Sequence, residues 1–135
     1  MVGLFVIRQA TAEDARAVFD LVWPRVGDLA MGTPCAVATA QHIWRLIDGE
    51  GVILVNSDLT AAGAAWMADA SLVREKLCTG LWLVSERPRQ GLKVARALIE
   101  YARAQGAIPA CSARGELAKF YQRLGMVPRE TIYVG

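Results

Sequence analysis

Apolar residues along the chain recur with two different spacings, and together these predict strands alternating with helices. Short, nearly continuous apolar runs bounded by turn residues are typical of buried strands. Such runs lie at residues 3–8, 52–55, 60–67, 77–84, 108–111 and 131–134. Gly80 lies inside the run 77–84, where a glycine indicates a bulge or the close approach of another backbone.

Four other segments carry apolar residues at i, i+3, i+4 and i+7, the spacing of one helix face. The first is predicted to begin after an N-cap at Thr11 and to end near Trp23, because Pro24 follows. Segment 27–36 contains Gly and Pro and is predicted to be a loop, and Gly49, Gly106 and Gly125 are expected to end the other helices. The four faces comprise Ala15, Val18, Phe19 and Val22; Ala40, Ile43, Trp44 and Ile47; Val94, Ala97, Leu98, Tyr101 and Ala102; and Leu117, Phe120, Tyr121 and Leu124.

The resulting order is β-α-α-β-β-β-α-β-α-β. Helices alternating with strands predict an α/β fold in which a mixed central sheet is covered by helices on both faces. The 135 residues suffice for one domain with its own core, and no linker, repeat or low-complexity tract divides them. Residues 1–135 are therefore expected to form a single domain.

Composition narrows the class of protein. With 54% hydrophobic and 21% charged residues, a folded domain is expected, and a net charge of +2 does not favour bulk binding to nucleic acid. No apolar run approaches the ~18 residues of a membrane helix, and the apolar start is too short for a signal peptide. A cytoplasmic protein with no membrane partner is expected. Cys35, Cys78 and Cys111 are read as reduced thiols, and with His42 they lack metal-site spacing, so no metal is expected.

Positive charge gathers just after the run 77–84. Arg87, Arg89, Lys93 and Arg96 surround Gly91, where a basic turn is predicted to open a helix. Backbone N–H groups and the dipole of a helix N-terminus attract anions, whereas cations there cost stability unless an anion is near. The cluster therefore predicts a phosphate-binding site, with a solvated helix start as the alternative.

Two motifs give the chain a resemblance to the GNAT acyltransferase superfamily over nearly its whole length. The stretch Gln90-Gly91-Leu92-Lys93-Val94-Ala95 is similar to the family's Gln/Arg-x-x-Gly-x-Gly/Ala loop, which wraps the pyrophosphate of acyl-coenzyme A, although Lys93 stands at the family's middle glycine. The stretch from Leu117 to Met126 is similar to the family's helix ending in Tyr-x-x-x-Gly-Phe, with Met126 in place of Phe. Arg114 stands where the family often has Asn.

The resemblance implies an N-acetyltransferase that moves an acetyl group from its co-substrate acetyl-CoA to an amine, by direct attack on the thioester. Tyr121 would protonate the leaving thiolate, with a core tyrosine as the alternative. Glu86 is the candidate base and Glu75 the second, each with a solvated surface carboxylate as the alternative. Backbone N–H groups near Leu83 and Val84 would bind the carbonyl oxygen. The expected cofactor-binding residues are Leu83, Val84, Arg89, Gln90, Gly91, Leu92, Lys93, Val94 and Ala95.

Readings from other classes stay open. A phage-encoded or degenerate family member would act as a binding or assembly module, such as a phage structural protein, with weak or no catalysis. Lys93 is compatible with this reading, and a large exposed apolar patch would favour it. Nucleic acid is not an expected partner, because the positive charge is local.

The acceptor is expected to be an amine on a small molecule or a protein. Its recognition is assigned to segment 27–36, the second helix and the loop 68–74. His42 is a candidate for lining that side, although a structural histidine is the safer interpretation. A nucleophilic pair of Cys111 and His42 has no local support. Whether the chain forms a homo-oligomer is left open.

Overall fold

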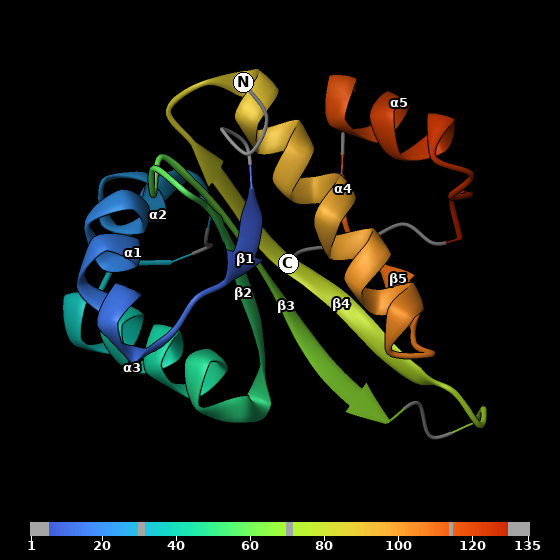
Figure 1. Ribbon diagram of the computed structural model, residues 1–135, viewed down its shortest axis with the longest axis horizontal. Helices are drawn as coiled ribbons and strands as arrows, with labels where there is room; N and C mark the ends of the chain where they lie inside the picture. The colour runs from blue at the N-terminus through green and yellow to red at the C-terminus, as the bar shows by residue number, and fades with distance from the viewer. Residues whose placement is uncertain (1–5, 30–31, 70–71, 114, 130–135) are drawn as a thin grey trace.

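The strands form one mixed sheet in the order β1-β2-β3-β4-β5 in the computed structural model, which describes residues 6–29, 32–69, 72–113 and 115–129 (Figure 1). The strands are β1 (Ile7–Gln9), β2 (Gly51–Asn56), β3 (Ala61–Asp69), β4 (Lys76–Ser85) and β5 (Ile108–Ala110). The first four are antiparallel to their neighbours, and β5 runs parallel to β4. The predicted mixed sheet is therefore confirmed.

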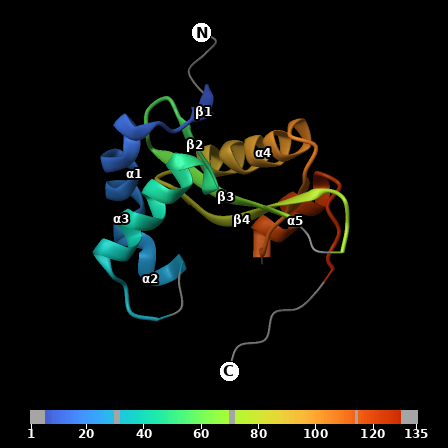
Figure 2. The same cartoon turned by 90° about the horizontal axis from the view of Figure 1, so that it is seen from below.

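Helices cover both faces of this sheet, as predicted. Figures 1 and 2 show α1, α2 and α3 on one side of the strands and α4 on the other, with α5 toward the β4 and β5 end of the sheet. The helices are α1 (Ala15–Val22), α2 (Val26–Leu29), α3 (Ala36–Arg45), α4 (Pro88–Ala104) and α5 (Gly115–Arg123). Short helical turns precede α1 (Ala12–Asp14), join α1 to α2 (Trp23–Arg25) and follow α3 (Leu46–Glu50).

Alternating side chains of the strands divide the interior into two cores. Ile53 and Val55 of β2 face α1 and α3, whereas Val52 and Leu54 face α4. Each of these four β2 side chains has a helix to pack against, which explains why β2 is an uninterrupted apolar run. On the α4 side, a Cβ on Gly63 would lie 2.8 Å from Leu98 Cδ1, so this glycine sets the close packing of α4 on β3.

The boundaries depart from prediction in the first third of the chain. The predicted loop 27–36 is wrong at its start, because α2 covers Val26–Leu29. Pro24 lies in the first turn of a new helical segment, where its missing N–H costs nothing, so the chain stays helical after α1 ends. Of the predicted strand 3–8, only the end is described, as β1. The predicted strand 131–134 lies outside the described residues.

The predicted helix ends are confirmed at three glycines. Gly49, Gly106 and Gly125 have φ values of 118°, 70° and 88°, in the region that glycine adopts without strain. Thr11 is the predicted N-cap of the first helical turn. Its N–H donates to Asp14 Oδ2 at 2.8 Å, and the Arg8 guanidinium donates to both oxygens of the same carboxylate.

Candidate active site between β4 and β5

Strands β4 and β5 diverge midway along β4. They pair only where Leu77–Thr79 lies beside Ile108–Ala110, whereas β4 continues along β3 to Ser85. Among the described residues, the stretch from Gly80 to Ser85 thus has no strand partner on its β5 side. At ~3.3 Å per residue it offers about 20 Å of open backbone edge. Leu83 and Val84, predicted to hold the cofactor, lie within this stretch.

A bulge in β4 marks the point of divergence. Ala64 pairs with Trp82 and the next residue, Ala65, pairs with Gly80, so Leu81 is an extra residue on β4. A Cβ on Gly80 would lie 3.1 Å from Cys111 Cβ, just after β5. Both readings of Gly80, a bulge and a close approach, are therefore confirmed. Such a bulge re-aims the backbone that follows, here Leu83 and Val84.

Tyr121 lies next to this bulge. Its side chain on α5 is half-buried and lines a small cavity formed by Ala65, Cys78, Gly80, Ala95, Leu98, Ile99, Pro109, Ala110, Cys111 and Met126. Burial raises the pKa of Tyr121 well above its usual range, and the contact with the Cys111 thiol raises this pKa further. The phenol is therefore protonated at neutral pH and keeps a proton available beside the open edge of β4.

Cys111 lies beside Tyr121 in this cavity. Burial raises the pKa of the Cys111 thiol, and the neighbouring Tyr121 hydroxyl opposes that effect without cancelling it. The thiol is therefore protonated and a poor nucleophile at neutral pH. The sequence does not indicate that Cys111 and Tyr121 are neighbours, because the two residues lie on different elements.

The basic segment is helical from its beginning. Helix α4 starts at Pro88, so Gln90–Ala95 forms its first turns, and the predicted turn is confined to the bend at Glu86 and Arg87. The prediction of a turn at 90–95 was wrong because Pro88 is preorganised for the first helical position. The N–H groups of Gln90 and Gly91 donate to the Arg87 carbonyl oxygen at 3.1 and 3.3 Å.

Gln90 points into the protein rather than toward an anion. The Thr60 hydroxyl donates to Gln90 Oε1 at 3.0 Å, and Asn56 Nδ2 donates to the Thr60 hydroxyl oxygen at 2.8 Å. Only 9% of Gln90 is exposed. These bonds tie the start of α4 to the turn between β2 and β3. Asn56 and Thr60 escaped the sequence analysis, which treated them only as turn residues.

The other residues of the motif divide into packing and exposed positions. A Cβ on Gly91 would lie 2.7 Å from Ser85 Oγ, so this glycine lets α4 begin close to the end of β4. Val94 and Ala95 are buried against the sheet, whereas Leu92 and Lys93 are half-buried. The arginines at 87, 89 and 96 are exposed, and within the described part of the chain no ion pair joins them to a carboxylate.

The two candidate bases lie away from Tyr121. Glu86 is exposed and follows the far end of β4, about 20 Å from Gly80 at ~3.3 Å per residue. Its N–H donates to the Thr60 carbonyl oxygen at 2.9 Å. Glu75 is exposed and precedes β4. Neither residue lines the Tyr121 cavity, so the structure does not bring a predicted base together with the predicted acid.

His42 has a partner of its own. Trp82 Nε1–H donates to His42 Nε2 at 2.9 Å, which joins α3 to β4. In the part of the chain that the structure describes, no hydrogen bond joins His42 to Cys111, so the nucleophilic pair of Cys111 and His42 has no support.

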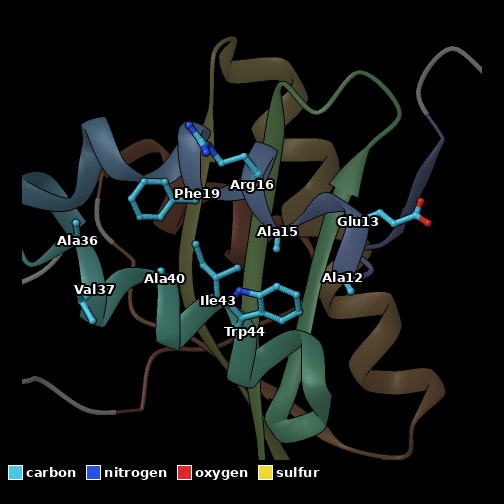
Figure 3. Close-up of a pocket in the computed structure, with 10 residues that line it drawn as sticks. All are labelled: Ala12, Glu13, Ala15, Arg16, Phe19, Ala36, Val37, Ala40, Ile43 and Trp44. Carbon is cyan, nitrogen blue, oxygen red and sulfur yellow. The ribbon is translucent and has the colours of Figure 1, made fainter.

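An apolar groove of about 470 Å³ lies between α1 and α3 (Figure 3). The rings of Phe19 and Trp44 and the side chain of Ile43 lie at its centre, with the strands behind. Its lining comprises Ala12, Glu13, Ala15, Arg16, Phe19, Ala36, Val37, Ala40, Ile43 and Trp44. The groove holds no predicted catalytic or cofactor-binding residue. The second predicted helix, α3, contributes Ala36, Val37, Ala40, Ile43 and Trp44 to it.

The described residues support neither a metal site nor a membrane-spanning helix. These residues contain no group of three or more His, Cys, Asp or Glu side chains arranged to hold a metal ion. None of the helices built from them is long and apolar enough to cross a membrane.

Comparison with solved structures identifies the fold. No family model and no curated protein sequence matches the chain. Glucosamine-6-phosphate N-acetyltransferase from Arabidopsis thaliana superposes with a TM-score of 0.70 at 20% identity, covering 97% of both chains. The chain has the GNAT acetyltransferase fold. A Trypanosoma brucei acetyltransferase gives a TM-score of 0.70 at 15% identity, covering 96% of this chain and 97% of that one.

The fold of this chain is also similar to that of a protein that is described as a regulator and not as an acetyltransferase. A transcriptional regulator from Bacillus halodurans C-125 gives a TM-score of 0.72 at 14% identity, covering 97% of this chain and 98% of that one. At such identities the likeness defines the fold alone, so the activity of this chain has to be argued from its own residues.

Proposed function

We propose that the chain is an acyl-CoA-dependent N-acyltransferase that moves an acetyl group from acetyl-CoA to an amine. The observation that carries the proposal is the open edge of β4. It runs from the Tyr121 phenol, beside the bulge, to the basic start of α4. An extended thioester ligand with a charged phosphate end matches a site that is polar backbone along its length and positive at one end.

The residues present fit each part of such a ligand. The exposed Arg87 and Arg89, with Lys93 one turn along, would attract its phosphates through charge. The open backbone at Leu83 and Val84 would orient its arm, and the Leu83 N–H, which points away from β3, would donate to its carbonyl oxygen. Bound acetyl-CoA would supply an activated thioester, and the protonated Tyr121 would hold the proton that the leaving sulfur needs.

The acceptor side is assigned to α3 and the segment before it. The acceptor would be an amine of a small molecule or a protein, and an amine must lose a proton to become a nucleophile. Since Glu86 and Glu75 are solvent-exposed and distant from Tyr121, we assign that proton to water reached through the open side of the site. We place the protein in the cytoplasm, where acetyl-CoA is supplied and its thiols stay reduced.

A calorimetric titration with acetyl-CoA tests the proposal. We expect saturable binding that weakens with salt, because exposed charges are screened. The double variant Arg89→Ala/Lys93→Ala should weaken binding by roughly tenfold or more. The matched control Arg74→Ala/Arg129→Ala removes the same charge from exposed positions outside α4 and should bind as the wild type does. Absence of binding by the wild type at millimolar acetyl-CoA would reject the enzyme.

The groove between α1 and α3 supports a second candidate, a binding or assembly module on the same fold. Val37 is 66% exposed and Trp44 is 50% exposed at its wall. Apolar residues gathered in a surface hollow are typical of protein contacts. On this reading, light scattering would show self-association that Trp44→Ser abolishes, and acetyl-CoA would not bind. A monomer that binds acetyl-CoA would decide for the transferase.

A further inference from the structure

The Trp82–His42 hydrogen bond is anchored at the bulge of β4. Trp82 is the first residue after the extra residue Leu81, and its indole packs against the core formed with α1 and α3. The indole N–H reaches across to His42 Nε2 at 2.9 Å, with the ring centroids 6.3 Å apart. A side chain on α3 therefore holds the strand at the residue where its register changes.

We propose that His42 is a positioning residue that fixes the β4 bulge through Trp82, and so sets where the backbone N–H group of Leu83 points. In its catalytic consequence this inference rests on the proposed function, because that N–H group is assigned to the carbonyl oxygen of the thioester. Its structural part, that His42 fixes the bulge, does not depend on the proposed function. A bulge leaves one residue unpaired, so the extra residue could lie at more than one position along the strand. A hydrogen-bonded side chain next to the bulge fixes one of these positions.

The bond requires one protonation state of the imidazole. The indole N–H is only a donor, so His42 Nε2 must carry its lone pair and the ring proton must sit on Nδ1. A protonated imidazole has no acceptor and cannot form the bond.

The surroundings of His42 favour the neutral form. Burial lowers the pKa of His42, the positive charge of Arg45 on the same helix lowers it further, and Glu50 opposes the shift. The residue that β4 contributes, Trp82, is uncharged. On α1, which packs against α3, Arg16 and Asp20 are paired with each other. The bond therefore persists at neutral pH and breaks only when His42 is protonated in mild acid.

The first test follows the bulge by NMR and needs no activity. His42 is the one histidine of the chain, so its ring signal reports its pKa without ambiguity. Trp82→Phe removes the donor and keeps an aromatic ring, and it should raise the pKa of His42 toward the ordinary value. His42→Leu should shift the amide signals of residues 81–84, whereas His42→Gln, whose side-chain oxygen can accept from the indole, should leave them near their wild-type positions. Amide signals of 81–84 that do not move in His42→Leu would overturn the proposal.

The second test is kinetic. With acetyl-CoA as substrate, His42→Leu should lower kcat about three- to tenfold with KM for acetyl-CoA unchanged, as expected for one lost positioning bond. His42→Gln should restore kcat and also remove the fall of activity in mild acid that we expect of the wild type. Equal activity of His42→Leu and wild type would contradict the catalytic part. Failure of the wild type to bind acetyl-CoA would reject the proposed function, and the amide shifts would still decide whether His42 fixes the bulge.

Discussion

The hydroxyl of Tyr121 and the thiol of Cys111 lie in the same cavity, where α5 meets the end of β5, and each shifts the pKa of the other. The pair adjoins Gly80, where β4 leaves β5. A phenol held against a sulfur atom at the open end of the site is well placed to meet the sulfur of a thioester. This relationship makes Tyr121 the first residue to test.

Replacing Tyr121 by Phe keeps the ring and its packing but removes the proton donor. Turnover should fall by roughly 10²–10⁴-fold, with affinity for acetyl-CoA nearly unchanged, because a general acid acts in the transition state. Steady-state kinetics and calorimetry on the same preparation measure both quantities. A Tyr121→Phe protein with wild-type turnover would show that Tyr121 is a packing residue and that the proton comes from elsewhere.

The three thiols should react at different rates. Cys35 is exposed, Cys111 is partly buried with a raised thiol pKa, and Cys78 is buried. An aromatic disulfide reagent should therefore modify Cys35 quickly, Cys111 slowly and Cys78 only on unfolding. Cys35→Ser serves as the control, since it should remove only the fast phase. Bound acetyl-CoA should slow the Cys111 phase further, and a Cys111 that reacts as fast as Cys35 would contradict its burial beside Tyr121.

Lys93 stands where the resembling family has a glycine, and its charge should contribute to phosphate binding. Lys93→Ala should weaken acetyl-CoA binding about three- to tenfold, as for the loss of one exposed charge–charge contact. Lys93→Gly should also weaken it. Lys76→Ala, an exposed position at the opposite end of β4, is the control. Tighter binding by Lys93→Gly would show instead that the lysine obstructs the ligand.

Gly91 should tolerate alanine only when Ser85 is also shortened. The Cβ of Gly91→Ala would lie 2.7 Å from Ser85 Oγ, so this variant should be destabilised by about 1–3 kcal/mol. The double variant Ser85→Ala/Gly91→Ala should recover most of that loss, because alanine favours the helix by about 1 kcal/mol over glycine. Chemical denaturation measures both. Equal stability of Gly91→Ala and wild type would mean that α4 does not begin this close to β4.

The Asp14 carboxylate should contribute to stability in a pH-dependent way. The Arg8 guanidinium, and then the Thr11 N–H, hold the pKa of Asp14 well below its usual range. A depressed folded-state pKa adds stability that is present above the unfolded pKa of about 4 and is lost as pH falls below it.

At pH 7 we expect Asp14→Ala to cost about 1–2 kcal/mol, since the capping bond is lost and Arg8 is itself 42% exposed. Asp20→Ala breaks the fully solvated pair with Arg16 and should cost less than about 0.5 kcal/mol. The difference between Asp14→Ala and wild type should shrink on acidification from pH 5 to pH 3. A difference that stays constant over this range would contradict the depressed pKa.

Local sequence signals predicted most of the fold, because they reflect local physics. Apolar periodicity located β2, β3, β4 and the long helices, and the glycines with positive φ defined three helix ends. The signals failed where two effects compete. Pro24 is compatible both with the end of one helix and with the start of the next. In the structure it lies in the first turn of a new helical segment. The start of α4 was also predicted wrongly, because Pro88 begins the helix where a turn was expected.

The site was predictable only as far as its residues belong to one segment. Tyr121 and the arginines were proposed as site residues from local motifs. The partners Cys111, Thr60 and Trp82 come from distant elements, and no spacing in the sequence relates them to Tyr121, Gln90 and His42. The bond of Gln90 to Thr60 was not predicted for this reason, since it spans two elements.

The most direct test of the account is to map bound acetyl-CoA onto the chain by NMR. Backbone amides of the 135-residue protein would be followed during titration with the ligand. We predict that the largest shifts fall on residues 80–84 and 87–93 and on Tyr121, with little change in the groove between α1 and α3. Shifts confined to that groove, or no shifts at millimolar ligand, would contradict the placement of the thioester between β4 and β5.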